Sequence, residues 1–269
     1  MNLTCAGIEN ITVDAAADGS VSLLPQIERY WSRRSESYSD LVRFEMSHEN
    51  ERMWMDVITE KIPADRYPRV LDIGTGPGFF AICLAKRGFD VTAVDYTPAM
   101  LERAKANAGC WNEFITFRRM DAQALEFADG TFDAIVTRNL TWNLEDPARA
   151  YREWRRVLKK GGKLLNFDAG WYSYLYDEEK SAEYARDREA VKASKIYDYN
   201  SYPEGHKMEA IAQDLLLSRL QRPEADIGML YAAGFGLVEA DLQIGEKVWD
   251  ETEKVNYRST PMFLLEAEA

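Results

Sequence analysis

Residues 69–78 read Arg-Val-Leu-Asp-Ile-Gly-Thr-Gly-Pro-Gly, an apolar run that ends in a glycine-rich turn. The apolar half predicts a buried strand. Glycine is needed in the turn because a Cβ would block either the turn conformation or the close approach of a ligand. Residues 79–87 have helical spacing and stop at Gly88, a typical helix C-cap. A strand, a glycine turn and a helix open a nucleotide-binding βαβ unit.

The glycines are spaced G-x-G-x-G, whereas the dinucleotide fingerprint is G-x-G-x-x-G. Asp72, just before the glycines, is also unusual for a dinucleotide site. The next predicted strand ends at Asp95, where an acid about 20 residues past the glycines can accept hydrogen bonds from ribose hydroxyls. The alternative is that Asp95 is the N-cap of a helix that starts near Pro98.

Four ordered motifs resemble those of class I S-adenosylmethionine (SAM) dependent methyltransferases. They are Val-Leu-Asp-Ile-Gly-Thr-Gly-Pro-Gly at 70–78, Val-Asp-Tyr-Thr-Pro-Ala-Met-Leu at 94–101, Phe-Asp-Ala-Ile-Val at 132–136 and Leu-Lys-Lys-Gly-Gly-Lys at 158–163. The sequence most resembles the small-molecule branch that includes ubiquinone/menaquinone methyltransferase-like enzymes, and the match covers roughly residues 67–168. The resemblance implies an enzyme that moves a methyl group from SAM to a small molecule and leaves S-adenosylhomocysteine (SAH).

Alternating strands and helices predict an α/β fold with a doubly wound, mostly parallel sheet. Strands are expected at 70–73, 91–94, 115–118, 134–137 and 163–167, and helices at 79–87, 98–108 and 147–159. Asp146 is expected to cap the last of these helices and Gly161 to end it, with Tyr151, Trp154 and Leu158 facing the sheet. A helix at 223–233, a strand at 237–242 and a final antiparallel strand at 262–266 would complete the seven-stranded Rossmann-like sheet that the resemblance implies.

Three parts are expected along the chain. Residues 1–62 form an N-terminal arm and a helical cap, with helices at 23–47 and 50–62; residues 63–170 and 223–269 form the SAM-binding core. Residues 171–222 interrupt the alternation after strand five and hold seven of the fourteen tyrosines. Because ligands bind at the carboxyl ends of such strands, we expect this helical insertion, with the helix around residues 30–38, to form a lid over the cofactor. The alternative is a dimerisation element, since a homodimer could use the same aromatics.

The resemblance also implies the cofactor-binding residues: Tyr30, Arg33, Tyr38, Asp72, Gly74, Thr75, Gly76, Asp95, Tyr96, Met100, Asp121, Ala122 and Asn139. In the family, an aromatic and an arginine of the helix before the core can reach the methionine carboxylate. The glycines approach the methionine moiety, and both Asp72 and the Asn139 backbone are expected near its amino group. Asp121 and the Ala122 N–H would meet the adenine. Packing of Tyr96 and Met100 at a helix start, a solvated turn carboxylate at Asp121 and core aromatics on residues 30–38 are the structural alternatives.

Trp142, Trp171 and Tyr172 follow strands four and five and are expected to wall the acceptor pocket. Aromatic faces suit a cationic or planar ligand, although the same residues could simply anchor the insertion. Residues 138–142 do not read Asn-Pro-Pro-Tyr or Asp-Pro-Pro-Tyr, which argues against amino-methyltransferases that act on adenine or glutamine. Methyl transfer needs a base only when the nucleophile must lose a proton, so no catalytic residue is assigned.

Composition narrows the partners. The net charge is −12, with 45 acidic and 33 basic residues and no basic stripe, which disfavours nucleic-acid substrates. Three cysteines (Cys5, Cys83 and Cys110) and two histidines lack metal-ligand spacing, so no metal is expected, and the sparse cysteines fit a reducing cytoplasm. No stretch predicts a signal peptide or a membrane span. The rival functions are a non-catalytic SAM-binding regulator and a nicotinamide-dependent oxidoreductase.

Overall fold

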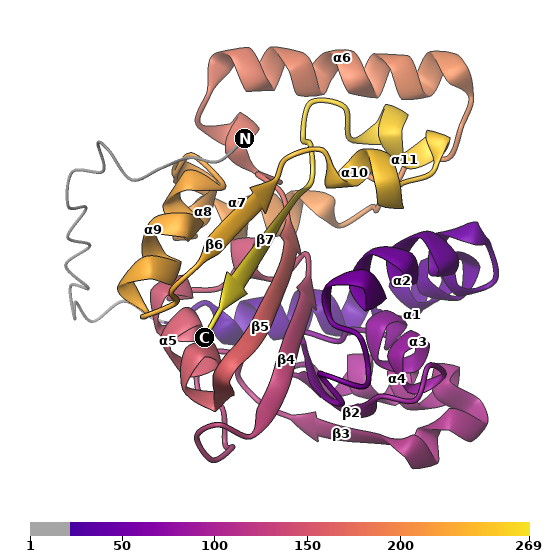
Figure 1. The fold of residues 1–269 in the computed structure, drawn as a ribbon. Coiled ribbons are helices and arrows are strands. Elements are labelled where there is room, and N and C mark those ends of the chain that lie inside the picture. Colours follow the sequence, from indigo (N-terminus) through magenta and orange to yellow (C-terminus); the bar gives the residue numbers. More distant parts are fainter. Residues whose placement is uncertain (1–21) are drawn as a thin grey trace.

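A seven-stranded sheet forms the centre of the computed structural model, which describes residues 22–269 (Figure 1). The predicted arm at residues 1–20 lies outside the described residues. The strand order is β3-β2-β1-β4-β5-β7-β6. The strands are β1 (Arg69–Ile73), β2 (Asp90–Asp95), β3 (Ile115–Arg119), β4 (Phe132–Arg138), β5 (Leu158–Asp168), β6 (Val238–Asp241) and β7 (Phe263–Glu268).

Strands β1 to β5 pair in parallel, and β7 runs antiparallel between β5 and β6. Val70 of β1 lies opposite Val91 of β2 on one side and Ala134 of β4 on the other. The chain therefore winds outward from β1 in both directions, and this switch point is where such sheets bind ligands. The predicted doubly wound, seven-stranded fold with an antiparallel last strand is confirmed.

Both faces of the sheet are buried, because successive side chains of a strand point to opposite faces. Val70 packs on one side with α2 (Glu49–Lys61), α3 (Phe79–Ala85) and α10 (Ile244–Val248). Leu71 packs on the other side with α5 (Pro147–Val157) and α9 (Glu224–Ala232).

The predicted boundary between the fifth helix and the fifth strand is wrong. Helix α5 begins after Asp146, whose side chain caps it as predicted, but it ends at Val157 and not at Lys159. Leu158 belongs to β5 and pairs with Phe132, after which the register shifts so that Lys163 pairs with Ala134. Because Leu158 is buried and pairs within the sheet, the helix ends two residues earlier than predicted. Tyr151 and Trp154 are buried on α5 as predicted.

The helix α11 (Glu251–Asn256) was not predicted, nor was α10. A capping box starts α11: the Asp250 side chain accepts from the Glu253 N–H, and the Glu253 side chain accepts from the Asp250 N–H. The Asp-x-x-Glu spacing at 250–253 is the signal that could have predicted it.

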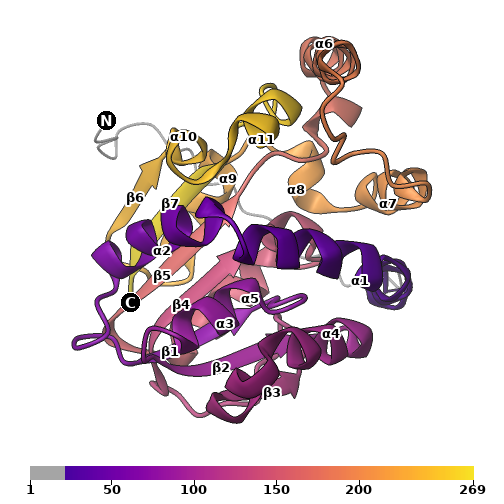
Figure 2. The same cartoon turned by 90° about the vertical axis from the view of Figure 1, so that its right-hand side faces the viewer.

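The remaining helices lie at the carboxyl edge of the sheet or beside it. They are α1 (Leu24–Met46), α4 (Pro98–Ala108), α6 (Glu178–Ser194), α7 (Gly205–Ala212) and α8 (Leu216–Arg219). Figure 2 shows α1 between the parallel strands and the helices α6 and α7 of the insertion. Among residues 22–269, no helix is long and apolar enough to cross a membrane.

Candidate functional site

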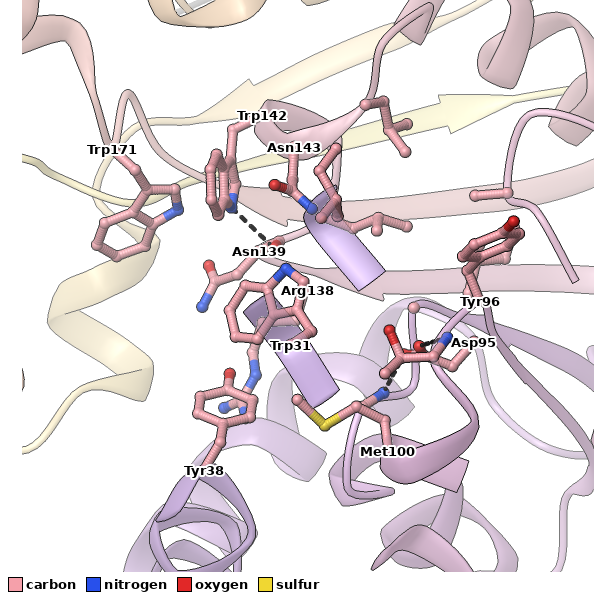
Figure 3. Close-up of a pocket in the computed structure, with 18 of the residues that line it drawn as sticks. Trp31, Tyr38, Asp95, Tyr96, Met100, Arg138, Asn139, Trp142, Asn143 and Trp171 are labelled. Atoms are coloured by element: carbon pink, nitrogen blue, oxygen red, sulfur yellow. Dashed lines mark hydrogen bonds between the residues drawn. The ribbon is translucent and has the colours of Figure 1, made fainter. Parts of the chain in front are cut away.

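A cavity of about 270 Å³ opens at the carboxyl ends of β1, β2 and β4. It is lined by the glycine loop and the end of β2 at one end and by residues of the insertion at the other. Figure 3 shows Asp95 and Met100 on one side of this space and Trp142 and Trp171 on the other. Strands far apart in sequence therefore bring their terminal residues to one site.

The glycine loop has a backbone that only glycine tolerates at two positions. Gly74 has a φ of +69°, and a Cβ there would lie 2.9 Å from the side chain of Leu140. Gly78 has a φ of +96°, and its Cβ would lie 3.1 Å from the Cβ of Ala104 in α4. The loop can therefore pass close to its neighbours and keep its backbone open to the cavity at Gly74 and Gly76.

Asp72 and Thr75 brace the loop from below and do not line the cavity. The Asp72 carboxylate is buried and accepts hydrogen bonds from the Thr75 hydroxyl at 2.6 Å and from the Ala81 N–H at 3.0 Å. Burial raises the pKa of Asp72 to about 7. Both residues border instead a separate cavity of about 30 Å³ beneath the loop. In this structure Asp72 supports the loop, and its expected contact with the cofactor amino group stays a prediction.

Asp95 lies at the end of β2 with its carboxylate at the cavity. One oxygen accepts from the Gly76 N–H at 2.9 Å and the other from the Thr97 N–H at 2.8 Å. Burial raises the pKa of this carboxyl above its usual value. The N-cap of α4 is Thr97 and not Asp95, so the capping alternative does not hold. Each oxygen keeps a lone pair for a ligand hydroxyl.

Four further predicted residues, Tyr96, Met100, Asp121 and Ala122, line the same end of the cavity. One oxygen of Asp121 accepts from the backbone N–H of Gln123 at 2.9 Å and from its side-chain amide at 3.1 Å, so this carboxylate is held in place.

Arg138 and Asn139 end β4 and face the cavity. Arg138, which was not predicted, is partly buried and lies 2.9 Å from a carboxylate oxygen of Glu45. Asn139 has a φ of +56°, and its carbonyl accepts from the indole N–H of Trp142 at 2.9 Å. The Oδ1 atoms of Asn139 and Asn143 are buried and find no hydrogen-bond partner among the described residues. The unpaired oxygens fit a ligand that donates hydrogen bonds, such as the SAM ammonium group, and the expected backbone contact of Asn139 stays a prediction.

The side chains of helix α1 that line the cavity differ in part from the predicted ones. Leu24, Ile27, Trp31 and Tyr38 line it, whereas Tyr30 and Arg33 do not. Tyr30 turns about 100° away from Trp31 and packs in a cluster with Met208 and Leu215 of the insertion; its burial raises its pKa to about 12. Arg33 is exposed and pairs with Glu204 at 3.4 Å. In the sequence, the seven-residue spacing between Trp31 and Tyr38 could have indicated that both side chains lie on one face of the helix.

The three predicted acceptor residues, Trp142, Trp171 and Tyr172, all line the cavity. Asp168, at the end of β5, accepts from the Trp142 backbone N–H at 3.1 Å and from the Trp171 indole N–H at 2.9 Å. Lining residues that sequence reasoning did not single out include Asn143, Tyr174, Tyr184, Asn200, Gly205, Glu209 and Tyr257. The density of tyrosines in 171–222 pointed to this region but not to individual positions.

Known sequences match the middle of this chain. Residues 71–166 match the family model described as a methyltransferase domain. The ubiquinone/menaquinone biosynthesis C-methyltransferase of Zymomonas mobilis is 36% identical over 134 residues, which are 49% of this chain and 55% of that protein. The demethylmenaquinone methyltransferase of Thermus thermophilus is 37% identical over 116 residues, 42% of this chain and 51% of that protein. The chain thus spans about half the length of the curated relatives it matches.

Solved structures share the fold at low identity. Phosphoethanolamine N-methyltransferase 2 of Haemonchus contortus, solved with SAM, superposes with a TM-score of 0.61 at 17% identity, covering 93% of this chain and 60% of that chain. The [4+2]-cyclase SpnF superposes with a TM-score of 0.53 at 19% identity, covering 81% and 80%. The matched family model shows a methyltransferase domain within residues 71–166, and the strand order of the sheet is that of the class I SAM-dependent methyltransferase fold.

Proposed function

We propose that this chain transfers the methyl group of SAM to a small-molecule acceptor by in-line displacement. The observation that carries this proposal is that Asp95 and the aromatic wall of Trp142, Trp171 and Tyr172 line one continuous cavity. A cofactor at the first end and an acceptor at the second would meet inside the same enclosed space. In-line transfer requires that proximity, and positioning supplies much of the catalysis.

The cofactor end offers groups that match SAM. Bound SAM would supply an electrophilic methyl group on a sulfonium sulfur. We assign the ribose hydroxyls to Asp95, the methionine moiety to the backbone at Gly74 and Gly76, and its ammonium group to the Oδ1 of Asn139. We assign binding of the adenine to Tyr96, Met100, Asp121 and Ala122.

At the acceptor end, the chain's own residues position the acceptor and exclude water. Burial raises the pKa of Tyr172 and of Tyr174 above the usual tyrosine value, so both stay protonated at neutral pH. Neither serves as a tyrosinate base. Catalysis by orientation fits this end better than catalysis by a dedicated base.

The small-molecule acceptor is supported by the net charge of −12 and by the aromatic enclosure. The names of the matched relatives refer to quinone biosynthesis. The family match stops at residue 166, before the insertion that supplies much of the acceptor wall. The acceptor of this chain is therefore argued from its own residues.

Two rival functions make different predictions. A nicotinamide-dependent enzyme should bind NAD more tightly than SAH, and the two can be titrated separately by calorimetry. A SAM-binding protein without turnover should bind SAH yet form none from SAM when cell extract supplies the acceptors. The [4+2]-cyclase SpnF has a similar fold, and a fold alone does not define the reaction. The assay for SAH formation is therefore needed in addition to the binding measurement.

The first prediction concerns Asp95. Replacing it with alanine removes two hydrogen bonds to a charged acceptor, so SAH binding should weaken by on the order of 2 to 4 kcal/mol. Calorimetry measures the change. Asp90→Ala is the matched control, since Asp90 begins the same strand at its exposed opposite end. Unchanged affinity in Asp95→Ala, with unfolding showing an intact fold, would contradict the cofactor assignment.

A further inference from the structure

The acceptor end of the cavity is built mainly from aromatic rings. Trp142, Trp171, Tyr172, Tyr174, Tyr184 and Tyr257 all line it. The ring centres of Trp142 and Tyr172 lie 4.9 Å apart, and those of Trp171 and Tyr257 lie 5.1 Å apart. Tyr174 stacks on Tyr184 with 4.2 Å between the ring centres. Neighbouring rings hold one another in place, so the wall presents fixed π-faces and edges to a ligand.

The charge at this end is negative. Glu209 of α7 lines the cavity, and one of its carboxylate oxygens accepts from the Tyr174 hydroxyl at 2.7 Å. The second oxygen has no hydrogen bond to a described residue. Among the described residues that line the cavity, the one Lys or Arg is Arg138. Its guanidinium is already paired with Glu45 at 2.9 Å and lies 4.5 Å from the ring centre of Phe79.

This combination selects the charge of the ligand. Aromatic faces attract cations through their quadrupole, and a carboxylate attracts them directly. A carboxylate or phosphate on the acceptor would meet Glu209 with no free cation among the described lining residues to offset it. The acceptor end therefore favours cations over neutral molecules and disfavours anions.

We propose that the acceptor is an amine that is methylated on nitrogen, with its positive charge held by the aromatic wall and Glu209. This inference rests on the proposed methyl transfer. The bound ammonium first releases one N–H proton to water, which frees the nitrogen lone pair. The neutral nitrogen then forms a bond to the methyl carbon with that lone pair while the carbon–sulfur bond breaks. The electron pair of that bond stays on sulfur, the positive charge moves to nitrogen, and any surplus N–H proton leaves to water.

A nitrogen nucleophile also suits the groups that are present. A phenol must lose its proton before or during transfer, and the buried tyrosines of the wall remain protonated. A bound ammonium also loses one proton, but the neutral amine that remains has a free lone pair and needs no further base to begin the reaction. Its charge develops beside Glu209 and the rings, which places the stabilisation where the transition state needs it.

Binding to the SAH-loaded protein tests the proposal with matched probes. Tyramine, tyrosol and 4-hydroxyphenylacetate share a phenol ring and end in an ammonium, a hydroxyl and a carboxylate. We expect tyramine and tetramethylammonium to bind, tyrosol to bind about tenfold more weakly than tyramine, and 4-hydroxyphenylacetate more weakly still. Tyrosol or 4-hydroxyphenylacetate binding as tightly as tyramine would overturn the proposal, as would no binding of either cation.

Variants assign the effect to one carboxylate. Glu209→Gln keeps an oxygen for the Tyr174 hydroxyl and should weaken tyramine binding about tenfold while leaving tyrosol and SAH unchanged. Glu204→Gln is the control, because Glu204 precedes the same helix and pairs outside the cavity with Arg33 and Lys207. It should leave all three affinities unchanged. Unchanged tyramine binding in Glu209→Gln would overturn the role of Glu209.

Turnover with SAM and tyramine distinguishes nitrogen from oxygen as the acceptor. Fragment masses should place the methyl group on the amine, and a methyl group on the phenol oxygen would overturn the inference. Failure of the wild-type protein to bind SAH would instead remove the proposed function itself. SAH binding without any preference for amines would remove only the inference about the acceptor.

Discussion

Asp168 is the residue that joins the cavity wall to the sheet. Its side chain is fully buried and accepts from the Trp142 N–H, the Trp171 indole and the Thr141 hydroxyl. It also lies 3.2 Å from Arg222, where the insertion returns to the core. One carboxylate thus fixes the segment after β4 and both ends of the insertion.

Asp168→Asn should destabilise the protein strongly. The substitution leaves the buried Arg222 with Asp226 as its one remaining ion-pair partner among the described residues and turns an acceptor into a donor. Breaking a buried pair in this way costs about 3 to 5 kcal/mol of unfolding free energy. Denaturant titration measures it. Asp40→Asn, which breaks an exposed pair with Arg43, should cost less than about 1 kcal/mol. Equal effects from the two variants would contradict the anchoring role of Asp168.

Sequence reasoning found individual residues where a strand end fixes the direction of the side chain. Asp95, Trp142 and Trp171 were placed from their positions after strands, and all three face the cavity. Glu209 and Tyr257 were missed because helices far along the chain carry them inward, and no local pattern encodes that approach. Arg138 was missed since a charged residue at a strand end is ordinarily solvated, and its burial depends on Glu45 of α1.

At the scale of elements, α1 and the insertion contact each other above the sheet. Tyr30 and Ile27 of α1 share a cluster with Met208 and Ile211 of α7. The guanidinium of Arg34 lies 4.3 Å from the ring centre of Tyr202. These contacts join two elements that both line the cavity, and we propose that the two elements move together as a lid for ligand exchange.

Hydrogen exchange tests the lid. Binding of SAH should slow exchange of the backbone amides in residues 24–46 and 171–222, because the ligand fills the space that both segments line. Amides of α5, which packs on the far face of the sheet, serve as the internal control. The oligomeric state should stay unchanged. Protection that follows protein concentration and ignores SAH would instead identify the insertion as an interface between two copies.

The sequence predicted the regular elements better than their junctions. Periodicity and caps located β1 to β4 and α1, α4 and α9 to within about two residues. The prediction of the α5–β5 junction was wrong because an apolar residue such as Leu158 can be buried on a helix face or in a strand. In the structure Leu158 pairs with Phe132 and so belongs to the strand. Helices α10 and α11 are short, and α10 is fixed mainly by tertiary burial of Ile244 and Val248.

At the scale of the whole molecule, the charge distribution should lower the free energy of unfolding as the pH rises. The chain has a net charge of −12, and burial raises the pKa values of three of its acids, Asp72, Asp95 and Glu253. Burial raises the pKa of Asp72 to about 7 and that of Glu253 to about 8, from ordinary values of 3.8 and 4.5. The folded state therefore holds protons that the unfolded chain releases. This contribution to stability is complete below about pH 4 and is lost as the pH rises through the two raised values.

The free energy of unfolding should therefore fall between pH 5 and pH 8, by on the order of 1 kcal/mol per unit of pH. Denaturant titration across this range measures the slope. The double variant Asp72→Asn/Glu253→Gln should flatten it, since each amide oxygen can still accept the hydrogen bonds now made by one carboxylate oxygen. Glu36→Gln/Asp40→Asn removes two charges from exposed sites and should keep the slope. Repeating the series at high salt screens general repulsion between surface charges. A slope that disappears with salt but survives in the buried double variant would assign it to surface charge instead.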